Sequence, residues 1–177
     1  MRDWMRRGDW IALGAGQAEL GVATVCIAAS LAISVYTIAT RTLLIPTSEW
    51  VLNLPLELIT LASLFGAGGL VAREGHIEVD FLVDWLPPTT GALARGAVSL
   101  LLGIVSLFLV TKGIGVTRQA MAIHLTIPEI FDLPVAFLNA VSTAAMVLWT
   151  LHFGWLAVRY WAGAFRLERS SPSDKAE

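Results

Sequence analysis

The chain has little charge and almost no cysteine, and both shortages exclude whole classes of protein. Of its 177 residues, 15% are charged and 56% are hydrophobic, whereas a soluble domain has about 25% charged and about 45–50% apolar residues. The single cysteine, Cys26, cannot form an internal disulfide, and no cysteine cluster suggests an iron–sulfur or zinc site. The composition therefore excludes an ordinary soluble domain and favours an integral membrane protein.

Enzyme motifs are also missing. The sequence has no glycine-rich phosphate loop, no metal-spaced set of histidines and cysteines, and no nucleophile elbow. Transport sites inside a membrane usually need buried polar groups or broken helices, but the central thirds of the apolar runs carry no charge. We therefore expect no enzymatic activity, and a subunit that packs against another protein rather than a channel or carrier.

What the chain does contain is four long apolar runs. About 20 helical residues cross the hydrocarbon core, and a helix is required because lipid offers no partner for free backbone groups. We expect an all-α integral membrane protein, a single membrane domain with spans at about 20–40, 51–72, 92–111 and 133–158, and a third helix that can continue through Ala122. Small residues recur at the four-residue spacing of tight helix pairs in Ala28/Ala32, Ala62/Gly66, Ser99/Gly103 and Ala136/Ala140/Ala144.

Both chain ends are basic. Residues 1–19 are either a basic segment that lies on the membrane surface or a frayed end that only sets orientation, and residues 160–177 are expected to be a disordered tail. Nine of the 12 Lys and Arg residues lie in the two ends and in the 73–95 connection, and three lie in the other two connections. Basic residues concentrate on the cytoplasmic side, so we expect both the N- and C-termini in the cytoplasm.

The connection after the second span is dense in ionisable groups. Apolar residues at helical spacing predict a short amphipathic helix at the membrane interface: Ile77, Phe81, Leu82 and Trp85. Pro87-Pro88 ends this helix, and Thr89 or Thr90 can cap the next one. His76 and Asp80 lie one helical turn apart, and they either dock the connection on a partner or are solvated interfacial groups.

Other polar positions also admit more than one interpretation. Glu57, the charged residue of the second span, is either an ion ligand or a group that reaches water or a partner. Arg41 either pairs with an acid of a partner or snorkels at its helix end. One alternative function is the membrane anchor of an electron-transfer enzyme, with a haem between His76 and His152. Another is a small homo-oligomeric transporter that uses Glu57.

The sequence resembles the small membrane subunit of TRAP (tripartite ATP-independent periplasmic) transporters over about residues 15–160. The resemblance is carried most clearly by Gly66, Arg73 and the motif His76-Ile77-x-Val79-Asp80-Phe81, followed by Leu86-Pro87. Further matching features are Glu19, Arg41, Pro46, Ser48-Glu49, Thr126-Ile127-Pro128 and Leu133-Pro134-Val135. The chain departs from the family at the start of the second span, where Asn53–Glu57 lacks the basic residue that often follows an acidic one.

The resemblance implies a scaffold in the bacterial inner membrane. Such a subunit packs against and braces the large transport subunit of a sodium-coupled importer for an organic acid, such as a dicarboxylate or a sugar acid. Its implied partners are the large multispanning membrane subunit, a periplasmic solute-binding protein and membrane lipids, with no nucleic acid, cofactor or metal. The residues expected to make assembly contacts, and not to bind substrate, are Arg41, Glu57, Gly66, Arg73, His76, Ile77, Val79 and Asp80.

Overall fold

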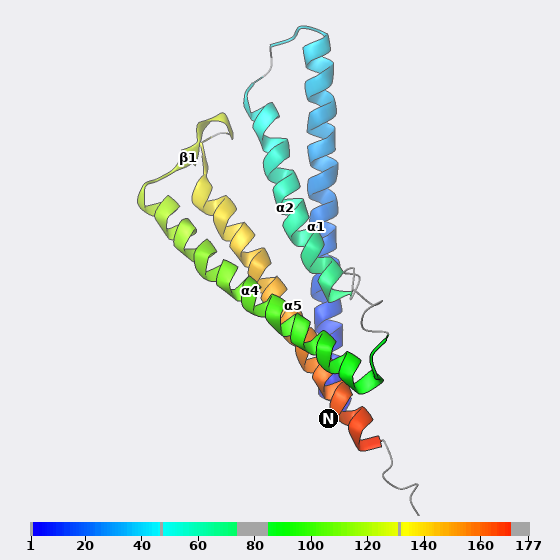
Figure 1. The fold of residues 1–177 in the computed structure, drawn as a ribbon. Helices are drawn as coiled ribbons and strands as arrows, with labels where there is room; N and C mark the ends of the chain where they lie inside the picture. The colour runs from blue at the N-terminus through cyan, green and yellow to red at the C-terminus, as the bar shows by residue number, and fades with distance from the viewer. Residues whose placement is uncertain (1, 47, 74–84, 131, 171–177) are drawn as a thin grey trace, which may run out of the picture.

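A computed structural model describes residues 2–46, 48–73, 85–130 and 132–170 (Figure 1). Most of this part consists of long helices: α1 (Arg2–Thr42), α2 (Trp50–Ala72), α4 (Pro88–Ala122) and α5 (Val135–Ser170). Each is long and apolar enough to cross a membrane, which confirms the prediction of an all-α protein with four spans. The interfacial helix expected after the second span falls on residues 74–84, outside the described residues. The side of the membrane on which the termini lie stays a prediction.

The helices form two hairpins, α1 with α2 and α4 with α5 (Figure 1). α5 also packs against α2 and touches α1, so it joins the two hairpins. The hairpins converge at the end that holds the N-terminus and diverge toward the opposite end (Figure 1). We call the converging end the basic end, because Arg6, Arg7, Arg73 and Arg159 lie there. The opposite end, with residues 43–46 and 123–134, is the loop end.

A proline explains part of the contact between α1 and α2. Pro55 lies inside α2 and has no N–H to donate to the carbonyl of Val51, four residues earlier. Thr37 of α1 lies with its hydroxyl 3.3 Å from that carbonyl oxygen, and Ser30 of α1 donates a 3.1 Å hydrogen bond to the carbonyl of Pro55. Hydroxyl groups of neighbouring helices commonly satisfy backbone groups that a membrane proline leaves free. These contacts therefore hold α1 against α2 in the half nearer the loop end.

The contact between α4 and α5 depends on small side chains. The buried residues of α4 recur every three to five positions up to Val110, and one more follows ten residues later: Gly91, Gly96, Ser99, Gly103, Ser106, Val110 and Ala120. The hydroxyl of Ser106 donates to the carbonyl of Met146 at 3.0 Å and accepts from the hydroxyl of Thr150 at 3.0 Å. Small residues allow the two backbones to approach closely, which is how helices associate in lipid. The predicted pair Ser99/Gly103 therefore lies on the packed face.

Both helices that arrive at the loop end stop in the same way. Leu44 after α1 and His124 after α4 have positive φ angles of 55° and 47°. The amide of the following residue, Ile45 or Leu125, bonds to a carbonyl five residues back, at 3.0 Å and 3.1 Å. This is the Schellman termination, which usually places glycine at the residue with positive φ. The two reversals therefore carry side chains at positions where glycine is favoured.

The connection from α4 to α5 is a short loop with secondary structure of its own. β1 (Thr126–Ile127) pairs antiparallel with β2 (Leu133–Pro134), and the 3-10 helix η1 (Pro128–Ile130) lies between them. Leu125 also accepts a 3.0 Å hydrogen bond from the amide of Val135. The two short motifs that the resemblance noted here, at 126–128 and 133–135, are thus brought side by side. η1 also contacts α2, so the loop helps to hold the diverging hairpins.

Three helix boundaries differ from those expected. α1 has 41 residues, about 60 Å at 1.5 Å per residue, so residues 2–19 are helical and continuous with the first expected span. That these residues lie on the membrane surface stays a prediction. α5 continues to Ser170, whereas the tail was expected to start at 160. Within this extension, the Trp161 ring lies against Gly96 of α4. α4 starts at Pro88 without a side-chain cap, and not at a Thr89 or Thr90 cap, because proline is favoured at the first helical position.

Candidate functional site

Three tryptophans of α5 mark the place where the helices meet. Trp149, Trp155 and Trp161 are six residues apart, and each six-residue step turns an α-helix by about 240°. The three rings therefore point in three directions about 120° apart. Each ring lies against a glycine of a different helix: Trp149 at Gly68 of α2, Trp155 at Gly8 of α1, and Trp161 at Gly96 of α4. α5 is thus the central helix, and its aromatic side chains fit surfaces that lack a Cβ.

Trp149 fixes α5 against α2. Its indole Nε1 donates a 2.8 Å hydrogen bond to the carbonyl of Leu64. A Cβ at Gly68 would lie 2.8 Å from the same ring, closer than side chains normally approach. The indole can reach the α2 backbone only because Gly68 has no side chain. The hydrogen bond therefore fixes where along α2 the Trp149 ring lies.

A buried pair of ionisable side chains joins α1 to α5 beside this contact. His152 Nε2 lies 3.3 Å from Glu19 Oε1, and the two side chains are 5% and 3% exposed. The second carboxylate oxygen, Oε2, is buried without a hydrogen-bond partner in the described part of the chain, and a Cβ at Gly68 would lie 2.6 Å from it. Buried polar groups require partners. The pair is therefore a polar link that the surrounding helices must hold in place.

α1 and α2 also approach closely about one helical turn from this pair. A Cβ at Gly69 would lie 2.7 Å from the carbonyl oxygen of Gly16, and a Cβ at Gly16 would lie 2.5 Å from Ala72 Cβ. Both positions therefore need glycine, because a larger residue would push against backbone or a fixed methyl group. The two helices therefore pack closely at this point of the α1–α2 hairpin.

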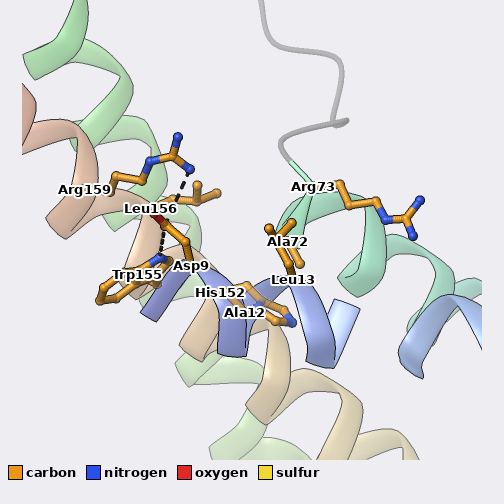
Figure 2. A pocket seen from close by; sticks show the side chains of 9 residues that line it. All are labelled: Asp9, Ala12, Leu13, Ala72, Arg73, His152, Trp155, Leu156 and Arg159. Atoms are coloured by element: carbon orange, nitrogen blue, oxygen red, sulfur yellow. Dashed lines mark hydrogen bonds and ion pairs between the residues drawn. The ribbon is translucent and has the colours of Figure 1, made fainter. Parts of the chain in front are cut away.

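A cavity of about 230 Å³ opens next to the pair, at the basic end (Figure 2). Its lining comes from α1, α2, α5 and the residue after α2: Asp9, Ala12, Leu13, Ala72, Arg73, His152, Trp155, Leu156 and Arg159. Asp9 Oδ1 accepts a 3.0 Å hydrogen bond from Trp155 Nε1 and lies 3.8 Å from Arg159 Nη1. Figure 2 shows Arg159 and Asp9 on one side of the cavity and Arg73 on the other. The lining thus combines an apolar wall with a charged rim.

The predicted assembly residues do not form one cluster. Arg73 lines the cavity, and Gly66 lies against Ala23, where an added Cβ would make an ordinary 3.6 Å contact. Glu57 is half-buried and Arg41 is exposed at the end of α1. The remaining members, His76, Ile77, Val79 and Asp80, lie outside the described residues. Among the residues that the structure describes, no three His, Cys, Asp or Glu side chains are grouped as a metal site would need.

Sequence reasoning missed the pairing of Glu19 with His152. The two residues are 133 positions apart, and nothing in a single sequence links them. The available signal was chemical: Glu19 borders one apolar run and His152 lies within another, and an ionisable residue there needs a partner if it is buried. In the haem hypothesis His152 was an axial ligand, but its Nε2 faces Glu19.

Comparison with known families gives a match over most of the chain. The family model described as the DctQ component of tripartite ATP-independent periplasmic transporters matches residues 30–163. No curated protein and no solved structure gives a significant match. The matched region covers most of the chain, including α2, α4 and most of α5. The chain therefore belongs to the DctQ family, the small membrane component of tripartite ATP-independent periplasmic transporters.

Proposed function

We propose that the chain is a scaffold that braces the large membrane subunit of a sodium-coupled importer for an organic acid. The DctQ family is an inner-membrane transporter component of bacteria and not an enzyme, and it works with a large membrane subunit and a periplasmic binding protein. The sodium coupling, the organic acid and the bracing role are our inferences.

The observation that carries the scaffold role is how the polar groups of the described helices are used. Ser30, Ser106, Trp149 and the Glu19–His152 pair all serve contacts between helices of this chain. By contrast, the outward face of α4 is apolar over several turns, with exposed Leu101, Ile104, Val105 and Phe108. A transport site needs polar groups left over for the solute. This distribution supports a rigid wall with apolar outer faces.

The proposed contacts with the large subunit begin with Glu57. Its half-buried carboxylate lies within α2 and makes no hydrogen bond or ion pair among the described residues. An acid at this position suits a donor supplied by a partner, because an unpaired intramembrane carboxylate is costly. We assign assembly roles also to Arg41, Gly66, Arg73 and the motif residues His76, Ile77, Val79 and Asp80.

Within the motif, Asp80→Ala should reduce assembly with the large subunit more than Glu78→Ala, because the family resemblance includes Asp80 and not Glu78. Co-purification of the large subunit with each tagged variant measures this. Equal recovery with both variants would mean that the connection acts only as an orientation signal.

Reconstituted transport tests the function as a whole. Liposomes should contain the large subunit with or without this chain, and the binding protein should be loaded with an organic acid outside. We expect uptake that requires this chain and an inward sodium gradient, and no uptake by this chain alone. Uptake by the chain alone would contradict the scaffold role, and uptake unaffected by sodium would contradict the coupling.

A further inference from the structure

We propose that the large subunit places a basic side chain between the two hairpins, where it binds the Glu57 carboxylate of α2 and the Ser142 hydroxyl of α5. The proposal rests on the scaffold function and adds to it the surface that receives the partner and the chemistry of the contact. This surface lies in the half of the molecule nearer the loop end, two helical turns from the contact between Trp149 and α2.

The Trp149 contact identifies the faces that α2 and α5 turn toward each other. The indole donates to the carbonyl of Leu64 at 2.8 Å, and its ring lies against Gly68. Glu57 precedes Leu64 by seven residues, and Ser142 precedes Trp149 by seven. Seven residues make nearly two turns of an α-helix and about 10 Å of its length. Because both helices start at the loop end, Glu57 and Ser142 lie on these two faces, nearer that end.

Both side chains are polar groups that the described helices leave without a partner. The hairpins diverge toward the loop end (Figure 1), so α2 and α5 separate in the half that holds them. Glu57 and Ser142 are half-buried, and neither makes a hydrogen bond or ion pair within the part of the chain that the structure describes. The neighbouring Thr143, by contrast, donates to the carbonyl of Asn139 at 2.6 Å. The facing surfaces therefore hold a carboxylate and a hydroxyl that a partner can bind.

The surface around Glu57 offers hydrogen-bond acceptors. Thr60, one turn away on α2, donates its hydroxyl proton to the carbonyl of Leu56 at 2.9 Å, so its oxygen has only lone pairs left for a partner. An ionised carboxylate also only accepts, whereas arginine and lysine have donors and no acceptor. The Ser142 hydroxyl accepts as well as donates. A basic side chain therefore matches this surface in charge and in hydrogen bonding.

Depth favours a protein partner over a lipid. Glu57 lies six residues beyond Val51, the expected start of the second span, which is about 9 Å along the helix. Half of the hydrocarbon layer is about 15 Å thick, and acyl chains at this depth have no donor for a carboxylate that is costly to leave unpaired. A second copy of this chain would bring the same acceptors and a like charge. The large subunit is the partner that can supply a cation here.

Photo-cross-linking in native membranes tests which partner lies on this surface. A benzophenone amino acid replaces Thr60 in the tagged full-length chain. Ile59 is the matched control position, because it is exposed at the same depth and points about 100° away on the helix. We expect Thr60 to cross-link a transmembrane peptide of the large subunit that contains an arginine or a lysine, with much less product from Ile59. Equal product from both positions, or a cross-link from Thr60 to a second copy of this chain, would overturn the surface.

Two variants test the contact itself. Glu57→Gln should reduce co-purification of the large subunit by at least about tenfold, the loss expected for one charge-assisted hydrogen bond, and Ser142→Ala by about threefold. Ser63→Ala is the control, because the Ser63 hydroxyl already bonds to its own helix, at the carbonyl of Ile59. Thermal unfolding of the isolated Glu57→Gln chain should be unchanged, since Glu57 has no partner within the described residues.

The outcomes separate this contact from the scaffold function. Full recovery of the large subunit with Glu57→Gln would overturn the ion pair while the scaffold function stands. Full recovery together with a loss of sodium-driven uptake would also overturn it, and would assign Glu57 to an ion. Failure to recover the large subunit even with the unmodified chain would contradict the scaffold function itself.

Discussion

At the scale of single residues, Glu19 is the acidic side chain around which α1, α2 and α5 meet. Its Oε1 lies 3.3 Å from His152 Nε2, while its second oxygen lies against the bare backbone of Gly68. Removing one member of a buried polar pair leaves the other without a partner, which costs more than the pair itself contributes. Glu19 is therefore expected to contribute to the stability of the fold.

We expect Glu19→Ala to lower the free energy of unfolding by about 1–3 kcal/mol, because His152 loses its partner in a buried setting. Glu19→Gln should cost less, since the amide oxygen can still accept from the imidazole. Thermal unfolding of the purified protein in detergent measures both. Glu49→Ala, at an exposed acid, is the control, and a shift as large as that of Glu19→Ala would show that the buried link has no special weight.

Two glycines of α2 should respond in opposite ways to alanine. Gly69→Ala places a Cβ 2.7 Å from the Gly16 carbonyl, so the helices must separate, at a cost of about 1–3 kcal/mol. Gly66→Ala meets only Ala23 at 3.6 Å and should be neutral or stabilise the helix by up to about 1 kcal/mol. The same unfolding assay compares them. Similar destabilisation by both would contradict the close crossing at Gly16 and Gly69.

At the scale of helices, Pro55 and the hydroxyls of α1 act together. Thr37→Val should cost about 0.6 kcal/mol, the average for side-chain hydrogen bonds between membrane helices. In a Pro55→Ala background the same change should cost less, because the restored N–H of residue 55 supplies the Val51 carbonyl. A double-mutant cycle on unfolding measures the coupling. Identical costs in both backgrounds would mean that Thr37 bonds only within its own helix, to Ile33 at 2.8 Å.

The existence and type of the helices followed from the sequence, because an uncharged run of about 20 residues has few other stable states in a membrane protein. Which faces pack did not follow. Ser99 and Gly103 are buried, but Ala28, Ala32, Ala140 and Ala144 are exposed despite the same spacing. Small-residue spacing identifies a face that can pack, and the partner helix decides whether it does. Trp149 and Glu19 decide this for α5, through contacts between distant segments.

Helix ends were the least predictable boundaries. Residues 2–19 and 160–170 are polar enough to suggest separate segments, yet both are helical. Contacts with other helices account for this: Asp9 in the early part of α1 accepts a hydrogen bond from Trp155 of α5, and Trp161 in the late part of α5 lies against Gly96 of α4. The residues that line the cavity were likewise only partly predicted. Arg73 was a candidate from the sequence, whereas Asp9 and Trp155 were identified only from the fold.

At the scale of the whole molecule, the chain is a wall with one reinforced end. The hairpins converge at the basic end, where tryptophans, glycines and the Glu19–His152 pair lock α5 to its neighbours, and diverge at the loop end (Figure 1). α1 is about 60 Å long, roughly twice the hydrocarbon thickness, so it must project beyond the membrane. Such a shape, with apolar outer faces, suits a subunit that holds a larger membrane protein in position.

The central claim, that this wall braces a large transport subunit, is tested most directly by isolating the tagged chain from its native membranes in mild detergent. Mass spectrometry then identifies what accompanies it. We expect a large, apolar, multispanning membrane protein in near-stoichiometric amount, whose recovery falls in Glu57→Ala and not in the control Glu49→Ala. Recovery of the chain alone, or with redox subunits in place of a multispanning transporter, would contradict it.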